Sequence, residues 1–362
     1  MKRLTLYIIK EISFPLLFGV MAFTFIIFGT SIMFSVINEA IKYHIPLGQT
    51  ILLLTLQLPQ VINLSLPMGT LLGSLVTFSR LNNDHEIIAI RASGISLSAL
   101  IKPVLICGLT VSFVGIILSE FIVPNAMTTA NNLSNIYKNQ NKPTIKKNIT
   151  FTEYNKGMPK RIINIKEVKK GELKNVTIAE FNNGELNTII KAKKGEWLTS
   201  NGWKFHHGIM HKINPQNPLR ISTIKFKKEI INLEMNPSSM QQRNRQVIEL
   251  NARELKERIK EKKKLGLDTI RDLMDYHTKF AIAFASLIFA LLGIPIGFKP
   301  QRNSSATGIG LTLITILIYY VLISIGMALG RMEILNPILA TWLPNIIIGT
   351  TSIIMLKRII KH

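Results

Sequence analysis

Six long stretches without a charged residue flank a polar middle. Three lie on each side of it, at residues 12–38, 47–79, 103–119, 280–298, 303–330 and 334–356. A helix of about 20 apolar residues is long enough to cross the hydrocarbon core of a bilayer. Helices of this length in a soluble protein would carry a polar face, and these have none. The pattern predicts a polytopic α-helical membrane protein with six transmembrane helices, the third of them short and ending near Val123.

The polar middle has the pattern of β-strands. Bulky and polar residues alternate over residues 203–209 and again over 219–223. Asn201-Gly202 and Asn182-Asn183-Gly184 separate such runs and suit hairpin turns, because Asn and Gly tolerate a positive φ. We expect a β-rich domain here, as a sandwich, a jelly roll or an open barrel, inserted between helices 3 and 4.

Residues 247–264 return to a helical pattern, with charge pairs at i,i+4 such as Glu254 and Arg258, and with Gly266 as a C-terminal stop. This segment leads into the fourth span. It is either a solvated connector or an element that passes motion between the domain and the membrane. The predicted division is therefore 1–123 for three membrane helices, 124–274 for the β-rich domain with its connector helix, and 275–362 for the last three helices.

The short loops differ in charge from one side of the membrane to the other. The opposite side carries only Lys42 and Arg331, whereas the side of the N-terminus carries ten basic residues: Lys2, Arg3, Lys10, Arg80, Arg91, Lys299, Arg302, Lys357, Arg358 and Lys361. Basic short loops stay in the cytoplasm, and long domains are exempt from this rule. Both termini are thus expected in the cytoplasm and the middle domain outside, in the periplasm of a bacterial inner membrane protein.

The net charge, the single cysteine and the histidines limit which classes of function are possible. A net charge of +23 would indicate nucleic-acid binding in a soluble protein. Beside six spans, an anionic lipid or glycolipid surface is the more consistent partner, and a biased genome composition is the alternative. The single cysteine, Cys107, excludes an intramolecular disulfide. His206, His207 and His211 lack the Cys or carboxylate ligands of a metal site, so we expect no metal and no cofactor.

The most distinctive cytoplasmic loop is NNDHEIIAIRASGIS, residues 82–96. Asn83 and Glu86 have the spacing of a capping box, and Gly94 ends the apolar stripe formed by Ile87, Ile88 and Ile90. We predict an amphipathic helix over residues 83–93. Helices that lie on lipid favour basic polar faces, so Asp84 and Glu86 favour a groove of a soluble protein instead.

Three segments resemble the lipopolysaccharide-export permease family of the LptF/LptG type, over nearly the full length. They are LPMGTLLGSLVTFSRLNNDHEIIAIRASGIS (66–96), ELNARELKERIKEKKKLGLD (249–268) and HTKFAIAFASLIFALLGIPIGF (277–298). The order of three spans, β-domain and three spans is also similar.

The resemblance implies a set of partners. The helix at residues 83–93 would be the coupling helix that enters a groove of a cytoplasmic ABC ATPase subunit, with Glu86 matching the groove-binding carboxylate. The other residues of this helix that we expect to contact the ATPase are Asp84, Ile87, Ile90 and Arg91. The exported domain would be a β-jellyroll that joins a periplasmic β-jellyroll bridge protein towards the outer membrane. Two permease subunits, as a homodimer or a heterodimer, would enclose a cavity that extracts lipopolysaccharide from the inner membrane.

The sequence departs from the family at two cavity positions. Family members often carry basic side chains where this chain has Met33 and Gln60. Either the substrate is an atypical lipopolysaccharide with few phosphates, or the partner subunit carries the charge, or one gene serves as both subunits. These two residues are our substrate-cavity candidates.

Two other functions are alternatives to export. A secondary transporter would keep ionisable residues at membrane depth, and the six stretches have none, although Pro59, Pro67, Gly69 and Gly73 could break the second span. Those glycines are also typical of close helix packing. A membrane-anchored assembly module would need only one span. The sequence has no GxxxxGK[ST] motif and no intramembrane catalytic arrangement, so we expect no enzyme, with ATP hydrolysis in a separate subunit.

Overall fold

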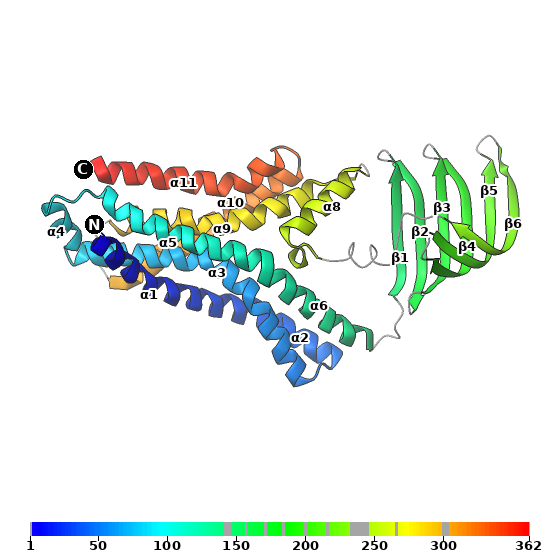
Figure 1. Cartoon of the computed structure of the whole chain (residues 1–362), viewed down its shortest axis with the longest axis horizontal. Coiled ribbons are helices and arrows are strands. Elements are labelled where there is room, and N and C mark those ends of the chain that lie inside the picture. Colours follow the sequence, from blue (N-terminus) through cyan, green and yellow to red (C-terminus); the bar gives the residue numbers. More distant parts are fainter. Residues whose placement is uncertain are drawn as a thin grey trace. The chain divides into compact units, whose positions relative to one another are not determined.

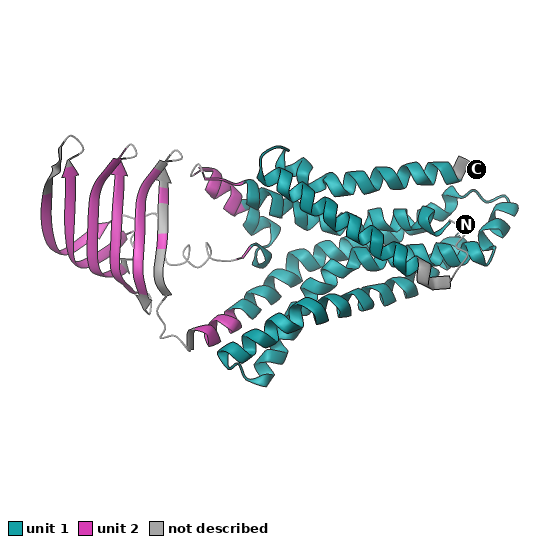
Figure 2. Ribbon diagram, turned by 180° about the vertical axis from the view of Figure 1, so that it is seen from behind, with its two compact units in different colours: residues 1–131, 247–256, 270–362 teal, residues 132–246, 257–269 magenta. Residues whose placement is uncertain are grey.

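The chain folds into two compact units, which Figure 2 distinguishes by colour. The first contains residues 1–131, 247–256 and 270–362, and the second contains residues 132–246 and 257–269. The computed structural model describes residues 2–140, 146–155, 158–169, 172–182, 185–198, 202–214, 217–231, 246–264, 267–298 and 304–361. The domain boundaries predicted after residues 123 and 274 lie inside helices.

The prediction of six transmembrane helices is confirmed over the described residues, where six helical segments are long and apolar enough to cross a membrane (Figure 1). Four of these segments are the single helices α3 (Leu47–Asn83), α9 (Ile270–Gly297), α10 (Ser304–Arg331) and α11 (Pro337–Lys361). The first span joins α1 (Lys2–Ile27), the π-helix η1 (Phe28–Met33) and α2 (Phe34–Tyr43), and the third joins α5 (Ser98–Ile117), the π-helix η2 (Leu118–Ile122) and α6 (Val123–Gln140).

The third span is much longer than its charge-free stretch predicted. Helix α6 continues to Gln140 because Val123, Met127 and Ala130 recur at helical spacing and are buried, which keeps one face of this polar segment apolar. The helix therefore continues well past Val123, where we expected the third span to end. The first charged residue, Glu120, marks the end of the apolar stretch, but the helix continues beyond it as the amphipathic helix α6.

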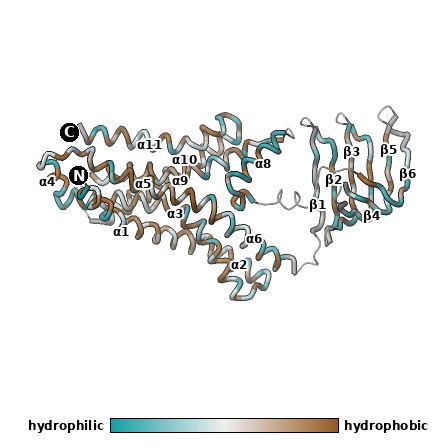
Figure 3. The backbone as a smooth tube through the Cα atoms, in the orientation of Figure 1, coloured by the Kyte–Doolittle hydropathy of each residue, from teal (hydrophilic) through white to brown (hydrophobic). Residues whose placement is uncertain are grey.

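Helix α3 lies at the centre of the helical unit. In its most apolar window 78% of the residues are buried, against 11% in the first span and 22% in α10. The outer helices expose large apolar side chains such as Phe25, which is 80% exposed. Apolar positions accordingly dominate the helical unit in Figure 3. Such outward apolar faces suit contact with lipid tails or with another membrane helix.

Small residues bring α3 close to its neighbours on both sides. A Cβ atom at Gly73 would lie 2.8 Å from the Cα atom of Leu16 on α1. A Cβ atom at Gly293 on α9 would lie 2.6 Å from the Cβ atom of Ser74. The Ser74 hydroxyl in turn donates a 2.6 Å hydrogen bond to the carbonyl of Ala290. Gly73 of the second span therefore serves close helix packing.

The second span is continuous. Helix α3 runs through Pro59 and Pro67 without interruption, and Gly69 packs against Val20 of α1. A broken helix in the membrane is what a secondary transporter would use to bind an ion through backbone carbonyls. The prolines of α3 do not create such a break.

The predicted β-rich domain is confirmed as one antiparallel sheet in the order β1 to β6 (Figure 1). Its strands are β1 (Lys146–Asn155), β2 (Met158–Lys169), β3 (Glu172–Asn182), β4 (Glu185–Leu198), β5 (Gly202–Asn214) and β6 (Asn217–Ile231). Each described strand pairs with the next one along the chain, which makes the sheet a meander. The jellyroll-like description thus holds only in the broad sense of a curved antiparallel sheet with its own core.

Cross-strand apolar neighbours build that core. Ile163 pairs with Ile178, Ile178 with Ile190, and Ile190 with Met210, so one row of side chains crosses β2 to β5 on the same face. The three isoleucines are buried, and Met210 packs against the same cluster. Rows of this kind are the main source of sheet stability.

The predicted alternation of β5 breaks at His207. His207 has a φ of 51° and no pairing partner in β4 or β6, whereas the residues on either side of it are paired. The register does not shift there, because Lys193 of β4 is unpaired as well. The buried face changes across this position, so Trp203 is 1% exposed but Ile209 is 36% exposed. The expectation that residues 203–209 alternate throughout was therefore wrong after His207. The hairpin residues 183–184 and 199–201 lie outside the described residues.

The connector starts later than predicted. A short 3₁₀ turn, η3 (Val247–Glu249), precedes α8 (Ala252–Lys264). Asn251 caps α8, because its Oδ1 accepts a 2.8 Å hydrogen bond from the Glu254 N–H while Glu254 Oε2 accepts one of 3.0 Å from the Asn251 N–H. This reciprocal pair is a capping box with Asn in place of Ser or Thr. The predicted stop at Gly266 lies outside the described residues.

Candidate functional site

The loop between α3 and α5 holds a separate seven-residue helix, α4 (Glu86–Ala92). The chain turns out of α3 at His85, which has a φ of 57°, and leaves α4 at Gly94, which has a φ of 81°. The Gly94 N–H donates to the carbonyl of Arg91 at 3.0 Å. The prediction that Gly94 ends this helix is thus confirmed, because glycine adopts the left-handed conformation without strain.

The capping box predicted at Asn83 and Glu86 is wrong. Asn83 is the last residue of α3, and the residue before α4 is His85, whose side chain makes no capping hydrogen bond. The predicted helix over residues 83–93 accordingly shortens to Glu86–Ala92. Glu86 still lies in the first turn and Arg91 in the last, where their charges complement the helix dipole.

Two isoleucines anchor α4 to the membrane helices. Ile87 is only 2% exposed and packs in a cluster with Ile8, Phe78 and Leu97, and Ile90 packs against the same cluster. Ile88 points the other way and is 59% exposed. The apolar stripe predicted from the sequence is therefore split between an inward anchor and a single outward side chain.

Glu86 is held by a residue of α1. The Tyr7 hydroxyl donates a 2.7 Å hydrogen bond to Glu86 Oε2. A carboxylate can accept about four hydrogen bonds, so this one leaves acceptor capacity on Glu86 for a partner. Glu86 is partly exposed, and its carboxylate is oriented by α1 rather than by its own helix.

An ion pair beside this contact ties α1 to α3. Arg80 Nη1 lies 2.6 Å from Oε1 of Glu11, and Arg80 Nε lies 3.9 Å from Oδ2 of Asp84. The side chains of Arg80 and Asp84 are 47% and 55% exposed, so the pairs are solvated and individually weak. Together with Tyr7 they fix the position of the loop against the first turns of α1.

The structure brings the five predicted coupling residues onto one loop but on different sides of it. Asp84, Glu86 and Arg91 reach the surface, whereas Ile87 and Ile90 face the helices. The sequence reasoning missed Tyr7, Glu11 and Arg80. Only a weak signal could have found them: Tyr7 and Glu11 are four residues apart, and so are Arg80 and Asp84.

The two substrate-cavity candidates lie in different helical surroundings. Met33 is the last residue of the π-helix η1, and Gln60 lies in the middle of α3; both are partly buried. Single π-helical turns inside α-helices occur often at functional sites. The position of Met33 in a π-helix is therefore consistent with a role in the substrate cavity.

A second polar cluster lies where η2 meets the start of α8. Both carboxylate oxygens of Glu120 accept hydrogen bonds from the Ala252 N–H, at 2.9 and 2.8 Å. Lys279 of α9 donates to the carbonyl of Leu250, and Asn131 donates to Glu249 at 2.6 Å. A carboxylate at a helix N-terminus is favourable, so Glu120 fastens the first turn of α8 to the third span.

The histidines of β5 form no metal site. His206 lies 3.4 Å from Glu196, and His211 hydrogen-bonds Thr223 at 3.0 Å. His207 is exposed and has a φ of 51°. Over the described residues no group of three or more His, Cys, Asp or Glu side chains could hold a metal ion.

A comparison with protein families decides the identity of this arrangement. The model of the lipopolysaccharide export system permease LptF/LptG matches residues 6–358, which is almost the whole chain. The chain belongs to the LptF/LptG permease family. No curated protein sequence gives a significant match.

Membership of the LptF/LptG family makes the chain a membrane component of lipopolysaccharide export, not a catalytic enzyme itself. The match includes both halves of the helical unit, the sheet and α4. The polar clusters at Glu86 and Glu120 are thus features of an LptF/LptG permease. The first holds α4 against α1, and the second holds the start of α8 against the third span.

Proposed function

We propose that this permease is the transmembrane subunit of an ATP-binding-cassette exporter that extracts lipopolysaccharide from the inner membrane and passes it to a periplasmic β-jellyroll bridge. The family match and six spans support this proposal. The chain has no P-loop sequence of its own, so the energy of ATP has to reach it from another protein. A second permease subunit of the same family completes the membrane part.

The main support for the proposal is that contacts with the membrane helices hold α4 in a fixed position. A helix of seven residues has too few backbone hydrogen bonds to be stable alone. Ile87 and the Tyr7–Glu86 hydrogen bond hold α4 in place, and the exposed side of the loop then presents Asp84 just before α4, together with Ile88 and Arg91. A short helix with an apolar residue between charges suits insertion into a groove of a soluble ATPase.

The proposal places α4 and both termini in the cytoplasm and the sheet in the periplasm. The termini and α4 lie at one end of the helical unit (Figure 1). Eight of the ten basic short-loop residues fall in the described part of the chain, and Lys299 and Arg302 lie outside it. Among the described strands, β1 and β6 form the two edges of the sheet, and such edges suit edge-to-edge addition of another β-domain.

Co-purification tests the docking role. The Glu86→Lys variant reverses the charge at the docking surface, and we expect it to lose the ATPase from detergent pull-downs while it still inserts into the membrane. The matched control is Glu333→Lys, an exposed acidic residue in the loop between α10 and α11. Equal ATPase recovery with both variants would contradict the docking role of Glu86. Mass spectrometry of the wild-type complex identifies the ATPase and any bound lipid.

A further inference from the structure

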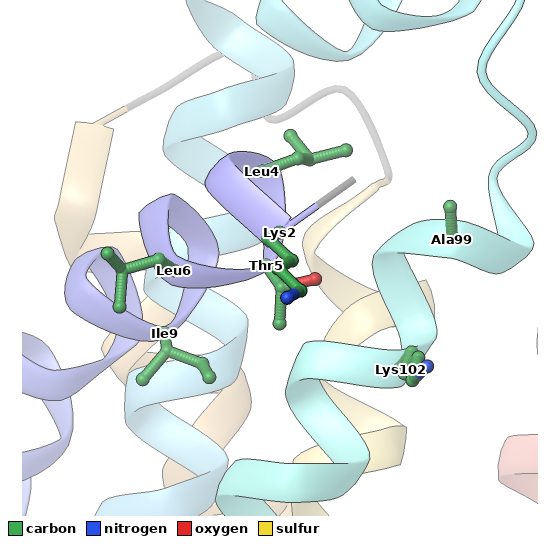
Figure 4. A pocket seen from close by; sticks show the side chains of 7 residues that line it. All are labelled: Lys2, Leu4, Thr5, Leu6, Ile9, Ala99 and Lys102. Atoms are coloured by element: carbon green, nitrogen blue, oxygen red, sulfur yellow. The ribbon is translucent and has the colours of Figure 1, made fainter.

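A cavity opens between the start of α1 and the start of α5, at the same end of the helical unit as α4. Its volume is about 340 Å³, and it is lined by Lys2, Leu4, Thr5, Leu6, Ile9, Ala99 and Lys102 (Figure 4). Cavities of about 300 Å³ and above are large enough for a small ligand. None of these residues belongs to the docking loop, so the cavity is separate from the site at Glu86.

The lining combines two cations with an apolar wall. Lys2 and Lys102 come from different helices, and over the described residues neither forms an ion pair. Ala99 lies in the first turn of the 20-residue helix α5, where the helix dipole also favours a negative charge. Leu6 is 70% exposed beside these cations. The cavity thus offers positive charge and hydrocarbon within one small volume.

We propose that this cavity binds the headgroup of an anionic glycerophospholipid such as phosphatidylglycerol. Lys2 and Lys102 would contact the phosphate, and Leu4, Leu6 and Ile9 would contact the upper part of the acyl chains. Basic pockets between transmembrane helices are known to hold anionic headgroups of this class. A lysine that only extends its side chain to the membrane surface needs no cavity. Here Lys2 and Lys102, from separate helices, line the same cavity.

A lipid bound in this cavity would join the start of α1 to the start of α5. The start of α1 also contacts Glu86 through Tyr7. Lys2 and Tyr7 both lie within the first two turns of α1. An anionic lipid bridging Lys2 and Lys102 would therefore fix the same helix end that orients the docking loop. Lipid occupancy and loop position would be linked through α1.

The test measures lipid retention by native mass spectrometry. The full-length protein is purified in a neutral detergent and titrated with phosphatidylglycerol or with phosphatidylcholine. We expect the wild type to retain phosphatidylglycerol over phosphatidylcholine, and Lys2→Gln/Lys102→Gln to bind phosphatidylglycerol about tenfold more weakly. The control Lys10→Gln/Lys357→Gln removes the same charge from exposed positions outside the cavity and should match the wild type within about twofold.

Two further arms identify the source of the phosphate. Lys2→Arg/Lys102→Arg keeps both charges and should restore binding, which also shows that the Gln variant does not act through misfolding. Glycerol phosphate at millimolar concentration should not displace the lipid, because it lacks acyl chains. Equal weakening in the cavity and control variants, displacement by glycerol phosphate, or equal retention of phosphatidylcholine would each overturn the proposal.

Discussion

The hydroxyl of Tyr7 lies 2.7 Å from Oε2 of Glu86, across 79 residues of sequence. It joins the start of the first span to the start of α4. A protein that binds α4 and changes the direction of the Glu86 carboxylate therefore acts on α1 as well. This contact links the proposed docking surface directly to a membrane helix that is distant in the sequence.

The variant Tyr7→Phe removes the hydroxyl and keeps the ring. We expect the ATPase still to co-purify, because Glu86 remains, but ATP-driven release of lipopolysaccharide should fall by roughly three- to tenfold, since a hydrogen bond to a charged group contributes about 1 kcal/mol or more. Release from proteoliposomes measures this. Tyr320→Phe, on α10, is the control and should release lipid at the wild-type rate.

The Arg80–Glu11 ion pair predicts charge-swap rescue. Arg80→Glu and Glu11→Arg should each destabilise the protein, and the double variant should recover part of the loss, because the two side chains lie 2.6 Å apart. The coupling free energy should be only about 0.5–1 kcal/mol, since Arg80 is half exposed. Thermal unfolding in detergent, measured as a double-mutant cycle, gives this value. Strict additivity of the two single variants would show that the ion pair contributes nothing.

Close packing of α3 on α1 predicts a large effect of a small substitution. Gly73→Val places carbon atoms where Leu16 already lies, so it should lower the free energy of unfolding by about 1–3 kcal/mol. Gly310→Val on α10 is the matched control, because a Cβ atom there has no neighbour within 4 Å. A lower unfolding temperature for Gly73→Val alone supports the packing role; equal temperatures for the two variants would argue against it.

A buried polar chain links the last three spans. The Tyr319 hydroxyl donates a 3.0 Å hydrogen bond to Asn345 Oδ1, and Asn345 Nδ2 donates one of 2.8 Å to the carbonyl of Ala281. Tyr319→Phe should destabilise the protein by about 0.6–1.7 kcal/mol, the range for hydrogen bonds between membrane helices. Thermal unfolding measures the loss, with the neighbouring Tyr320→Phe as reference. If Tyr319→Phe unfolds at the reference temperature, the hydrogen bond has no net stabilising effect.

Repeating patterns predicted most of the fold. Six charge-free stretches indicated the six spans, and alternation with Asn-Gly turns indicated the sheet, because both signals extend over many residues. Single-residue features were harder to predict. The spacing of Asn and Glu suited a capping box at Asn83 and at Asn251, yet only Asn251 forms one, because α3 continues through Asn83. The break in the alternation of β5 at His207 has no marker in the sequence.

The candidate site was only half predictable. The loop and its acidic residues stand out in the sequence, but the partner of Glu86 does not, since nothing local connects it with Tyr7. Burial was also hidden: Ile87, Ile88 and Ile90 look alike in the sequence, and only the packing of α1, α3 and α5 places Ile87 inside and Ile88 outside. Tertiary contacts of this kind decide which residues a partner can reach.

Labelling of a cysteine on α4 tests the central claim, that a cytoplasmic motor binds this helix. In a Cys107→Ser background, Ile88→Cys places a thiol at an exposed position of α4. A membrane-impermeant maleimide should not label it in intact spheroplasts. After permeabilisation it should label the thiol in the free permease but not in the purified complex with the ATPase. Labelling from outside, or equal labelling with and without the ATPase, would contradict the account.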